Sequence, residues 1–397
     1  MTRLKTLLIA AIMPLISLAG PIEASVITCF PGSEIYELEG HSGLRLRDSI
    51  NDITVNWGLF DFNAPNFVYR FVKGETDYRA GACPTDMFVG LYAGDGRKVM
   101  EQRLNLTAGQ AETLASLVKE NLRPENRVYR YNYVKDNCST RILDMIERAI
   151  GDTVHLGIAP MNITGDHPSF RNSMRHYHAA YPWYQFGIDL ALGSGLDRPI
   201  SNREQGYAPV TMFHLLQEAT ITDSTERQVP LVLDTTVLNE GLPQGASLPP
   251  TPFWQSPLFI SWILFIVTLS ISINDIRRKR LTRWLTTVIY SVSGVAGLII
   301  TFLIFISEHE ATSPNWLYLW LNPLCFIPAI GIWLKKGKIT IYSYQIVNFV
   351  ALILLIILWS VDVQSLNPAF LPLILCNLVL SATYIGLYQC HTRTRRQ

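Results

Sequence analysis

Cys138 is the residue whose setting is best suited to covalent chemistry. It stands in Asp136-Asn137-Cys138-Ser139-Thr140, where an N-cap residue precedes a stretch with the apolar spacing of a helix. A thiol in the first turn of a helix has a lowered pKa, and the backbone N–H groups there can bind an oxyanion. The position of Cys138 therefore predicts a nucleophile, with a structural disulfide as the alternative.

A thiolate nucleophile needs a base, and His41 is the first candidate. It lies in Gly40-His41-Ser42-Gly43, where the glycines let a substrate or another chain segment approach closely. Residues 35–48 partly alternate between apolar and polar side chains, as in a half-buried strand, and His41 falls on the polar side. This argues against a core histidine, although a structural or surface role stays open from these residues alone.

The cysteine count bears on the state of Cys138. Of six cysteines, three lie in or beside the apolar C-terminal part, which leaves Cys29, Cys83 and Cys138 in the N-terminal part. In an exported protein an odd thiol needs an explanation. Cys29 and Cys83 both stand in loop-like sequence near a proline. The sequence therefore predicts a disulfide between them and a free thiol at Cys138.

The elements that would carry these residues are of both types. Five strands are predicted, of which the first two form a hairpin: 35–48, 53–60, 87–92, 98–104 and 128–134. Two helices are predicted, one over 107–122 that begins with a capping box and one from Cys138 to Ile150. An aromatic-rich stretch over 67–72 favours a buried strand over a segment that dips into a membrane interface. This order predicts an α+β domain.

Both ends of the chain carry membrane signals. Residues 1–24 have the layout of a signal peptide, with two cations before an apolar run and small residues near Ala19 and Ala24. Five apolar runs lie close to the roughly 20 residues needed to cross hydrocarbon: 256–274, 284–306, 316–334, 341–361 and 369–389. The loops after the first, third and fifth runs are basic, so the positive-inside rule puts the C-terminus in the cytoplasm and residues 25–255 outside.

These signals divide the chain into five predicted parts. They are a signal peptide over 1–24, an exported domain over 25–237, a proline-rich linker over 238–257, five transmembrane helices over 258–390 and a cytoplasmic tail over 391–397. The linker carries five prolines, which makes it a stiff spacer that holds the exported domain close to the membrane.

Charge and motif content exclude several classes of function. The chain has 33 Lys and Arg against 32 Asp and Glu, and a net charge of +1 provides no field that would hold a nucleic acid. The remaining histidines have no metal-ligand spacing, so we expect neither a metal nor a cofactor. No apolar run contains a charged residue well inside it, which argues against a proton relay or a charged transport path.

Four motifs occur in order along the chain: Gly40-His41-Ser42-Gly43-Leu44-Arg45, Asn56-Trp57-Gly58-Leu59-Phe60-Asp61-Phe62, Asn137-Cys138-Ser139-Thr140-Arg141, and Trp183 through Gly187-Ile188-Asp189-Leu190 to Gly193 with Asp197. Together they resemble the Lnb-type lipoprotein N-acyltransferases. A histidine on an early strand, followed much later by Asn-Cys at a helix start, is also similar to the circularly permuted NlpC-type thiol fold of lecithin retinol acyltransferase and its relatives. The likeness covers nearly all of residues 30–215, whereas the apolar runs match in number more than in sequence.

The resemblance implies a permuted NlpC/papain-like exported domain followed by an all-α bundle of five transmembrane helices in the bacterial inner membrane. It also implies an enzyme that moves a fatty acyl chain from a membrane phospholipid to the α-amino group of the lipid-modified N-terminal cysteine of a diacylated lipoprotein. Cys138 would carry the acyl chain as a thioester. His41 would hold the thiol deprotonated and later take the proton from the attacking amine.

Further residues of such a site follow from the same resemblance. The imidazole needs a third group to orient it, and Asn56 is the first candidate. Asp48 or Asp61 would serve instead if the strand register differed. The backbone N–H groups of Cys138 and Ser139 are the expected oxyanion donors, and Asn137 is expected to cap the helix.

Two other functions stay open at this point. A membrane-anchored cysteine peptidase or cell-wall amidase would use the same thiol, with His176 or His178 downstream of it as the base. A sensor or transport accessory would bind a ligand in the exported domain and would keep its function in Cys138→Ser. The odd exported cysteine and the uncharged apolar runs weigh against the accessory.

Overall fold

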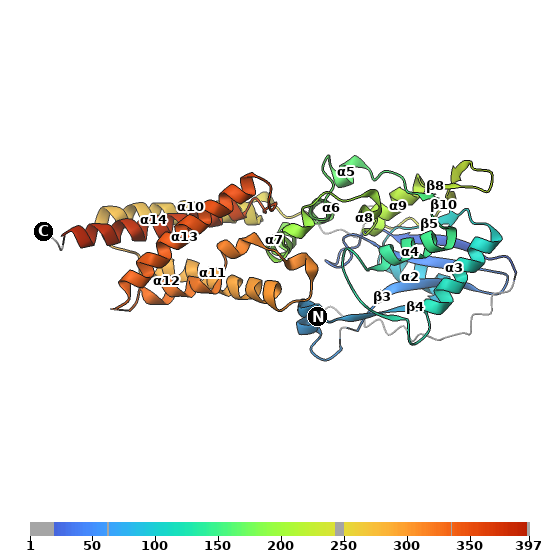
Figure 1. Cartoon of the computed structure of the whole chain (residues 1–397), viewed down its shortest axis with the longest axis horizontal. Coiled ribbons are helices and arrows are strands. Elements are labelled where there is room, and N and C mark those ends of the chain that lie inside the picture. The colour runs from blue at the N-terminus through green and yellow to red at the C-terminus, as the bar shows by residue number, and fades with distance from the viewer. Residues whose placement is uncertain (1–19, 62, 243–249, 335, 395–397) are drawn as a thin grey trace. The chain divides into compact units, whose positions relative to one another are not determined.

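The computed structural model describes residues 20–61, 63–242, 250–334 and 336–394, and the chain divides into two compact units (Figure 1). The sheet unit comprises Met1–Tyr177 and Pro199–Pro249, and the helical unit comprises His178–Arg198 and Pro250–Gln397. Residues 1–19 of the predicted signal peptide and 243–249 of the predicted linker lie outside the described residues. The predicted boundary after residue 24 falls inside the first strand, because β1 spans Glu23–Cys29.

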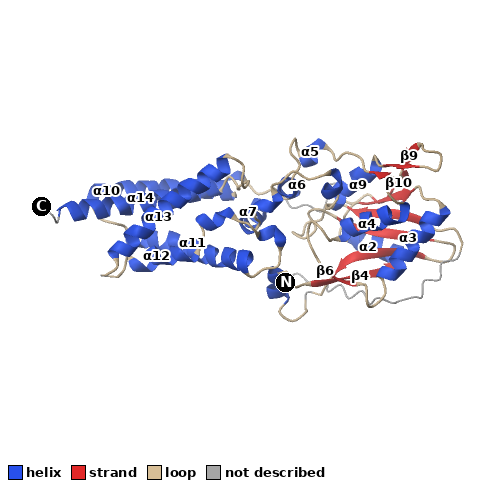
Figure 2. Cartoon of the chain, viewed as in Figure 1, coloured by secondary structure: helices blue, strands red, loops and turns tan. Residues whose placement is uncertain are grey.

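The sheet unit is built on a seven-stranded antiparallel sheet with the order β10-β5-β1-β2-β3-β4-β6. Strands are drawn in red in Figure 2. After β1, its strands are β2 His41–Arg47, β3 Asp52–Leu59, β4 Asp77–Pro84, β5 Val99–Leu104, β6 Val128–Arg130 and β10 Val232–Asn239. The predicted hairpin is confirmed as β2 and β3. A second, three-stranded sheet contains β7 Val154–His155, β8 Thr220–Thr222 and β9 Gln228–Pro230.

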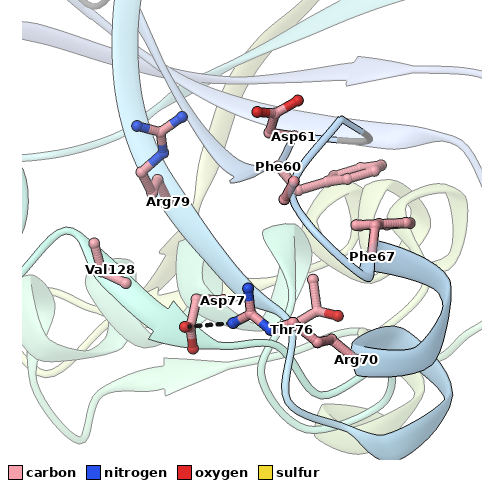
Figure 3. Close-up of a pocket in the computed structure, with 9 residues that line it drawn as sticks. Phe60, Asp61, Phe67, Arg70, Thr76, Asp77, Arg79 and Val128 are labelled. Carbon is pink, nitrogen blue, oxygen red and sulfur yellow. Dashed lines mark hydrogen bonds and ion pairs between the residues drawn. The ribbon is translucent and has the colours of Figure 1, made fainter.

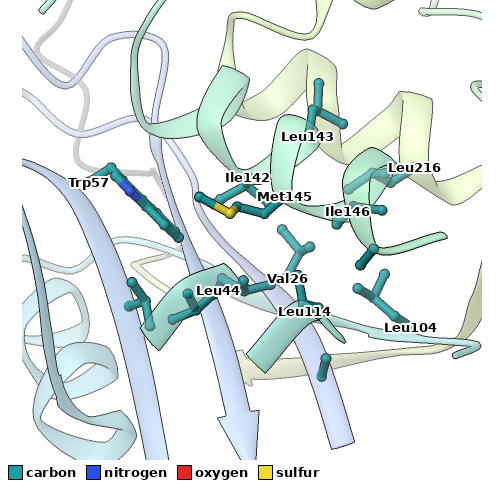
Figure 4. Close-up of a cluster of buried hydrophobic side chains, with 14 of the residues drawn as sticks. Val26, Leu44, Trp57, Leu104, Leu114, Ile142, Leu143, Met145, Ile146 and Leu216 are labelled. Carbon is teal, nitrogen blue, oxygen red and sulfur yellow. The ribbon is translucent and has the colours of Figure 1, made fainter. Parts of the chain in front are cut away.

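Two helices pack against the main sheet and form the largest core of this unit. They are α3 Ala108–Asn121, which begins with the predicted capping box, and α4 Cys138–Ile150. Leu114 of α3 and Ile142 and Ile146 of α4 are buried together with Leu44 of β2 (Figure 4). Because each fully buried Leu or Ile side chain stabilises the fold by about 1.5–3 kcal/mol, this packing fixes the helix that begins at Cys138 to the strand that begins at His41.

The other helices of the sheet unit are short, and two of them correct strand predictions. They are α1 Phe67–Lys73, α2 Thr85–Gly94, α5 Met161–Thr164, α6 Phe170–Tyr177, α8 Asn202–Gln205 and α9 Pro209–Gln217. The strand predicted over 87–92 is wrong, because it lies in α2, and the buried strand predicted over 67–72 is wrong, because it lies in α1. Short apolar runs do not distinguish strand from helix by their periodicity.

The predicted disulfide between Cys29 and Cys83 is also wrong. Both side chains are buried free thiols. Cys29 ends β1 and Cys83 lies in β4, and β2 and β3 run between these strands. With neighbouring strands ~4.8 Å apart, the two backbones are roughly 14 Å apart, whereas a disulfide needs Cα atoms within about 7 Å. The sequence pattern missed that Cys29 and Cys83 belong to strands rather than loops.

Four helices among the described residues of the helical unit are long and apolar enough to cross a membrane, and the remaining predicted span, over 316–334, stays a prediction. They are α10 Pro257–Arg278, α11 Arg283–Phe305, α13 Lys338–Ser360 and α14 Phe370–Thr394. The other described helical pieces of this unit are α7 Pro182–Ala191, η1 Ser194–Leu196, η2 Phe253–Gln255, η3 Glu310–Thr312, η4 Trp316–Leu319, η5 Pro323–Cys325 and α12 Phe326–Gly331.

The third predicted span is the broken segment η4-η5-α12. Pro323 follows Asn322, whose side chain accepts a hydrogen bond from the backbone N–H of Leu324 at 3.2 Å and begins a new turn there. Gly297 of α11 lies against this break, since a Cβ at Gly297 would come within 2.5 Å of the Asn322 backbone. Irregular backbone in an apolar unit is tolerated where protein covers it, and a helix glycine permits that close contact.

The segment His178–Arg198 belongs to the helical unit, although the sequence placed it within one exported domain over 25–237. Asn315 donates from Nδ2 to the backbone oxygen of Leu190 at 3.0 Å, and the N–H of Gly193 donates to the oxygen of Ala311 at 2.8 Å. The buried carboxylate of Asp189 accepts from the Asn367 side chain at 3.0 Å. The fourth motif therefore packs with the loops that join the apolar helices.

Candidate active site

His41 and Asn56 are brought together by the register of the β2–β3 hairpin. Gly43 pairs with Asn56, so His41, two residues earlier on β2, is the diagonal neighbour of Asn56. The His41 Nε2 atom lies 2.7 Å from Asn56 Oδ1. A carbonyl oxygen only accepts, so Nε2 carries a proton and donates it. This bond fixes the ring orientation and leaves Nδ1 to face a second partner.

Cys138 begins α4, and Asn137 holds that helix terminus in place. Asn137 Oδ1 accepts from the backbone N–H groups of Ser139 at 2.9 Å and Thr140 at 3.0 Å. Its Nδ2 atom donates to the backbone oxygens of Tyr133 at 2.7 Å and Tyr207 at 2.9 Å. Asn137 is itself buried, so this cap is both a helix start and a tie between three chain segments.

The thiol of Cys138 and the imidazole of His41 interact, and each shifts the other's pKa. Burial alone would raise the pKa of Cys138, but the charge of His41 and its hydrogen bond outweigh burial and lower it. Burial alone would lower the pKa of His41, but the Cys138 thiolate and the hydrogen bonds from Cys138 and Asn56 raise it. Both shifts favour a thiolate–imidazolium pair, the reactive state of a thiol nucleophile.

Ser42 is a member of the site that the sequence reasoning missed. Its backbone helps to lower the pKa of the Cys138 thiol. The Ser42 hydroxyl lies 3.4 Å from the Ser139 hydroxyl, which in turn lies 4.0 Å from the Cys138 sulfur. The signals in the sequence were its position directly after His41 and its place in the first of the four motifs.

The geometry separates the two expected oxyanion donors. The backbone N–H of Ser139 already donates to Asn137, so that proton is engaged in the helix cap. The backbone N–H of Cys138 belongs to the first helical residue, where an N–H has no carbonyl partner within the helix. The Cys138 amide is therefore the better candidate, with the Ser139 hydroxyl beside it.

Aromatic side chains of α2 form a wall against the part-buried His41 ring. The Tyr92 ring stacks on it with centroids 5.7 Å apart, and the Phe88 ring lies 6.3 Å away. Behind them Arg97 is buried, with its guanidinium 4.8 Å from the Tyr92 ring centroid and 3.2 Å from the Glu37 carboxylate. This wall confines the imidazole to a small range of orientations.

Glu39 is a buried carboxylic acid close to Cys138. The hydroxyl of Tyr207 donates to Glu39 Oε1 at 3.3 Å, and Tyr133 also hydrogen-bonds to this carboxyl group. Burial raises the pKa of Glu39 to about 8, and the nearby Cys138 thiolate adds to that rise. Near neutral pH the group is therefore mostly a neutral acid, which keeps another negative charge away from the thiolate.

The other candidates from the sequence have different partners. Asp48 accepts backbone N–H groups in the β2–β3 turn, and Asp61 accepts the N–H of Asn63 at 2.8 Å. His178 is in the helical unit, where Nδ1 lies 2.8 Å from Gln185 Oε1 and burial lowers the pKa of the ring to about 4. His176 packs edge-on against Tyr177. Within the described residues, no group of three His, Cys, Asp or Glu could hold a metal ion.

Comparisons with known proteins agree with this division into a sheet unit and a helical unit. Residues 20–165 match the profile of the Lnb N-terminal periplasmic domain, and residues 250–391 match the profile of the Lnb transmembrane domain. The chain belongs to the Lnb family. His41, Asn56 and Cys138 all lie within the part that matches the Lnb periplasmic domain. No curated protein and no solved structure matches the chain, so the permuted NlpC-like topology stays a prediction while the α+β class is established.

Proposed function

We propose that this Lnb family member is a lipoprotein N-acyltransferase that uses Cys138 as its nucleophile. The observation that carries the proposal is the Cys138–His41–Asn56 arrangement. In it the imidazole of His41 lies between the buried thiol of Cys138 and the side-chain amide of Asn56, which orients the ring. Family membership and the four apolar helices support the part of the proposal in which the substrates are membrane lipids and lipoproteins.

The first half-reaction transfers the acyl chain to the enzyme. The Cys138 thiolate attacks the ester carbonyl carbon of a phospholipid, and the Cys138 N–H stabilises the oxyanion that forms. When this intermediate collapses, the ester C–O bond breaks and the His41 imidazolium gives its proton to the leaving glycerol oxygen. The products are a lysophospholipid and an acyl-thioester on Cys138.

The second half-reaction delivers the acyl chain to the acceptor. The neutral α-amino group of the diacylated lipoprotein attacks the thioester carbonyl, and neutral His41 takes a proton from the attacking nitrogen. Collapse then breaks the C–S bond and restores the thiolate–imidazolium pair. Cys138 is buried, which limits the access of water to the thioester and favours the amine over hydrolysis.

The membrane helices would keep the catalytic domain at the bilayer, where both proposed substrates are found. A catalytic domain tethered to a bilayer meets phospholipid and lipoprotein at a raised effective concentration without new contacts. The basic loops after α10 and the broken segment, with the basic C-terminus, support a sheet unit on the periplasmic side of the inner membrane and a C-terminus in the cytoplasm. This topology requires the broken segment to cross the bilayer in addition to the four long helices.

Mass spectrometry of lipoprotein N-termini tests this proposal. Cells whose only candidate N-acyltransferase is this protein should add a third acyl chain to lipoproteins, and Cys138→Ser and His41→Ala should both abolish it. Cys83→Ser, which removes another thiol of the sheet unit, is the matched control and should retain it. Unchanged N-termini in the wild type, with cleavage of cell-wall peptides in their place, would support the alternative of a thiol peptidase or amidase.

A further inference from the structure

Helix α1 is an exception to the burial pattern of the sheet unit. Five of its seven residues, Phe67-Val68-Tyr69-Arg70-Phe71-Val72-Lys73, are apolar, yet none is buried. Val68 is 72% exposed, and Tyr69 and Phe71 are also exposed. A helix this rich in apolar side chains is normally buried, and an exposed apolar patch marks contact with a membrane or a partner.

A small cavity of about 210 Å³ opens beside α1 (Figure 3). Phe60 and Phe67 form its aromatic side, and Thr76 and Arg79 also line it. Its volume is below the ~300–1,000 Å³ of sites for drug-sized ligands, so it suits a small polar group. The Thr76 hydroxyl is buried and has no hydrogen-bond partner among the described residues. Such an atom is costly to bury unless a ligand satisfies it.

The charges around this cavity favour an anion. Arg70 and Arg130 share one carboxylate, that of Asp77, at 3.2 Å and 3.1 Å. Arg79 lines the cavity as well and makes no ion pair within the described part of the chain. Three guanidinium groups and the shared carboxylate leave a local positive charge, which the Asp61 carboxylate on the cavity wall offsets only in part. Guanidinium groups match phosphate in shape and charge.

We propose that the cavity beside α1 is a binding site for the phosphodiester headgroup of a bilayer phospholipid, with Val68, Tyr69 and Phe71 of α1 inserted at the membrane interface. Arg79 and the Thr76 hydroxyl would hold the phosphate oxygens. The pairing of a cationic cavity with an exposed apolar helix fits an amphiphile, in which phosphate and hydrocarbon are joined. A bilayer is also the surface to which the transmembrane helices of this chain tether the sheet unit.

Photocrosslinking of the full chain in lipid nanodiscs tests whether α1 meets lipid. Benzoylphenylalanine is placed at Val68 in one sample and at Ile50, which is 76% exposed in the β2–β3 turn, in the matched control. Irradiation in nanodiscs of phosphatidylethanolamine and phosphatidylglycerol should give phospholipid adducts at position 68 at least about tenfold more often than at position 50. Equal yields at the two positions, or adducts at 68 to protein only, would overturn the proposal.

Substitution in the cavity tests the headgroup contact. Arg79→Gln and Thr76→Val should each lower the adduct yield at position 68 by about tenfold, since each removes a donor to a charged oxygen. Arg47→Gln, which removes an exposed arginine of β2, is the control and should leave the yield unchanged. Loss of yield in the control as well, or no loss in either cavity variant, contradicts a phosphate site. Circular dichroism of all variants checks that each is folded.

The same nanodisc system tests whether the bound phosphate belongs to a lipid and whether the site depends on acyl transfer. Millimolar inorganic phosphate should not compete with the adduct, because the apolar helix supplies part of the binding; full competition would identify a free-phosphate site and overturn the lipid assignment. The site does not require acyl transfer, so Cys138→Ser should give the same adduct yield as the wild type. Failure of the proposed enzymatic function would therefore leave this result unaffected.

Discussion

Replacing Asn56 with Ala removes the group that orients His41 and is expected to slow thioester formation. The bond between His41 Nε2 and Asn56 Oδ1 is 2.7 Å long, Asn56 is buried, and the donor is charged in the imidazolium state. Hydrogen bonds to charged groups contribute about 1.5–3 kcal/mol. At about 1.4 kcal/mol per factor of ten in rate, Asn56→Ala should slow the first half-reaction by roughly 10- to 150-fold.

The assay is single-turnover release of lysophospholipid from the full chain in nanodiscs. Asn121→Ala is the matched control, because Asn121 Oδ1 accepts from Trp57 Nε1 at the same distance, 2.7 Å, in the same unit. The control should lose stability by about 1 kcal/mol while its rate stays within about twofold of the wild type. A wild-type rate in Asn56→Ala, or an equal loss of rate in Asn121→Ala, would refute the reasoning that Asn56 acts through His41.

Three further outcomes are expected. In wild type the pH midpoint for alkylation of Cys138 by iodoacetamide should lie below the ordinary cysteine value of about 8.5, and His41→Ala should move it above that value, because only the effect of burial then remains; an unchanged midpoint contradicts the ion pair. The raised pKa of Glu39 means that the folded protein binds the extra proton between the ordinary glutamate pKa and about 8, so stability should fall as pH rises through that window. Glu39→Gln should flatten this fall in thermal denaturation, and a slope equal to that of the wild type would count against it. Gly297→Ala should lower the thermal stability of the detergent-solubilised chain, because a Cβ there would lie within 2.5 Å of backbone, whereas Gly386→Ala in α14, with nothing within 4 Å, should not; equal melting temperatures would show that the broken segment is not packed against α11.

The sequence predicts the parts of this molecule that local signals govern. The capping box at Thr107 and the N-cap at Asn137 both begin the helices that they predict, because a side chain there satisfies N–H groups of its own first turn. The β2–β3 hairpin follows from alternation over a short span of sequence. Cys138 and His41 could therefore be singled out from their immediate neighbours alone.

What the sequence could not predict depends on residues that are distant along the chain. Whether Asn56, Asp48 or Asp61 faces His41 is set by strand register, which only the pairing of Gly43 with Asn56 decides. The disulfide prediction failed because the strands of Cys29 and Cys83 are separated by two others. A short stretch of neighbouring residues does not determine which strands pair or in which register.

Tertiary contacts also decide whether an apolar run forms one continuous helix. The run over 316–334 has the length of a span, yet Pro323 and the side-chain turn at Asn322 break it and Gly297 accommodates the break. Equally, Ser42 and Glu39 belong to the site only because the start of β2 lies beside the start of α4 in the folded chain. Their types are common in strands and turns, and nothing in their spacing marks them.

The measurement that tests the central claim most directly is the intact mass of the purified chain after incubation with phospholipid in the absence of any lipoprotein. The account predicts one added acyl chain that maps to the peptide containing Cys138, is released by neutral hydroxylamine and is absent from Cys138→Ser. An acyl chain that resists hydroxylamine and maps to another residue, or no added mass while lipoproteins are still N-acylated, would contradict a thioester on Cys138.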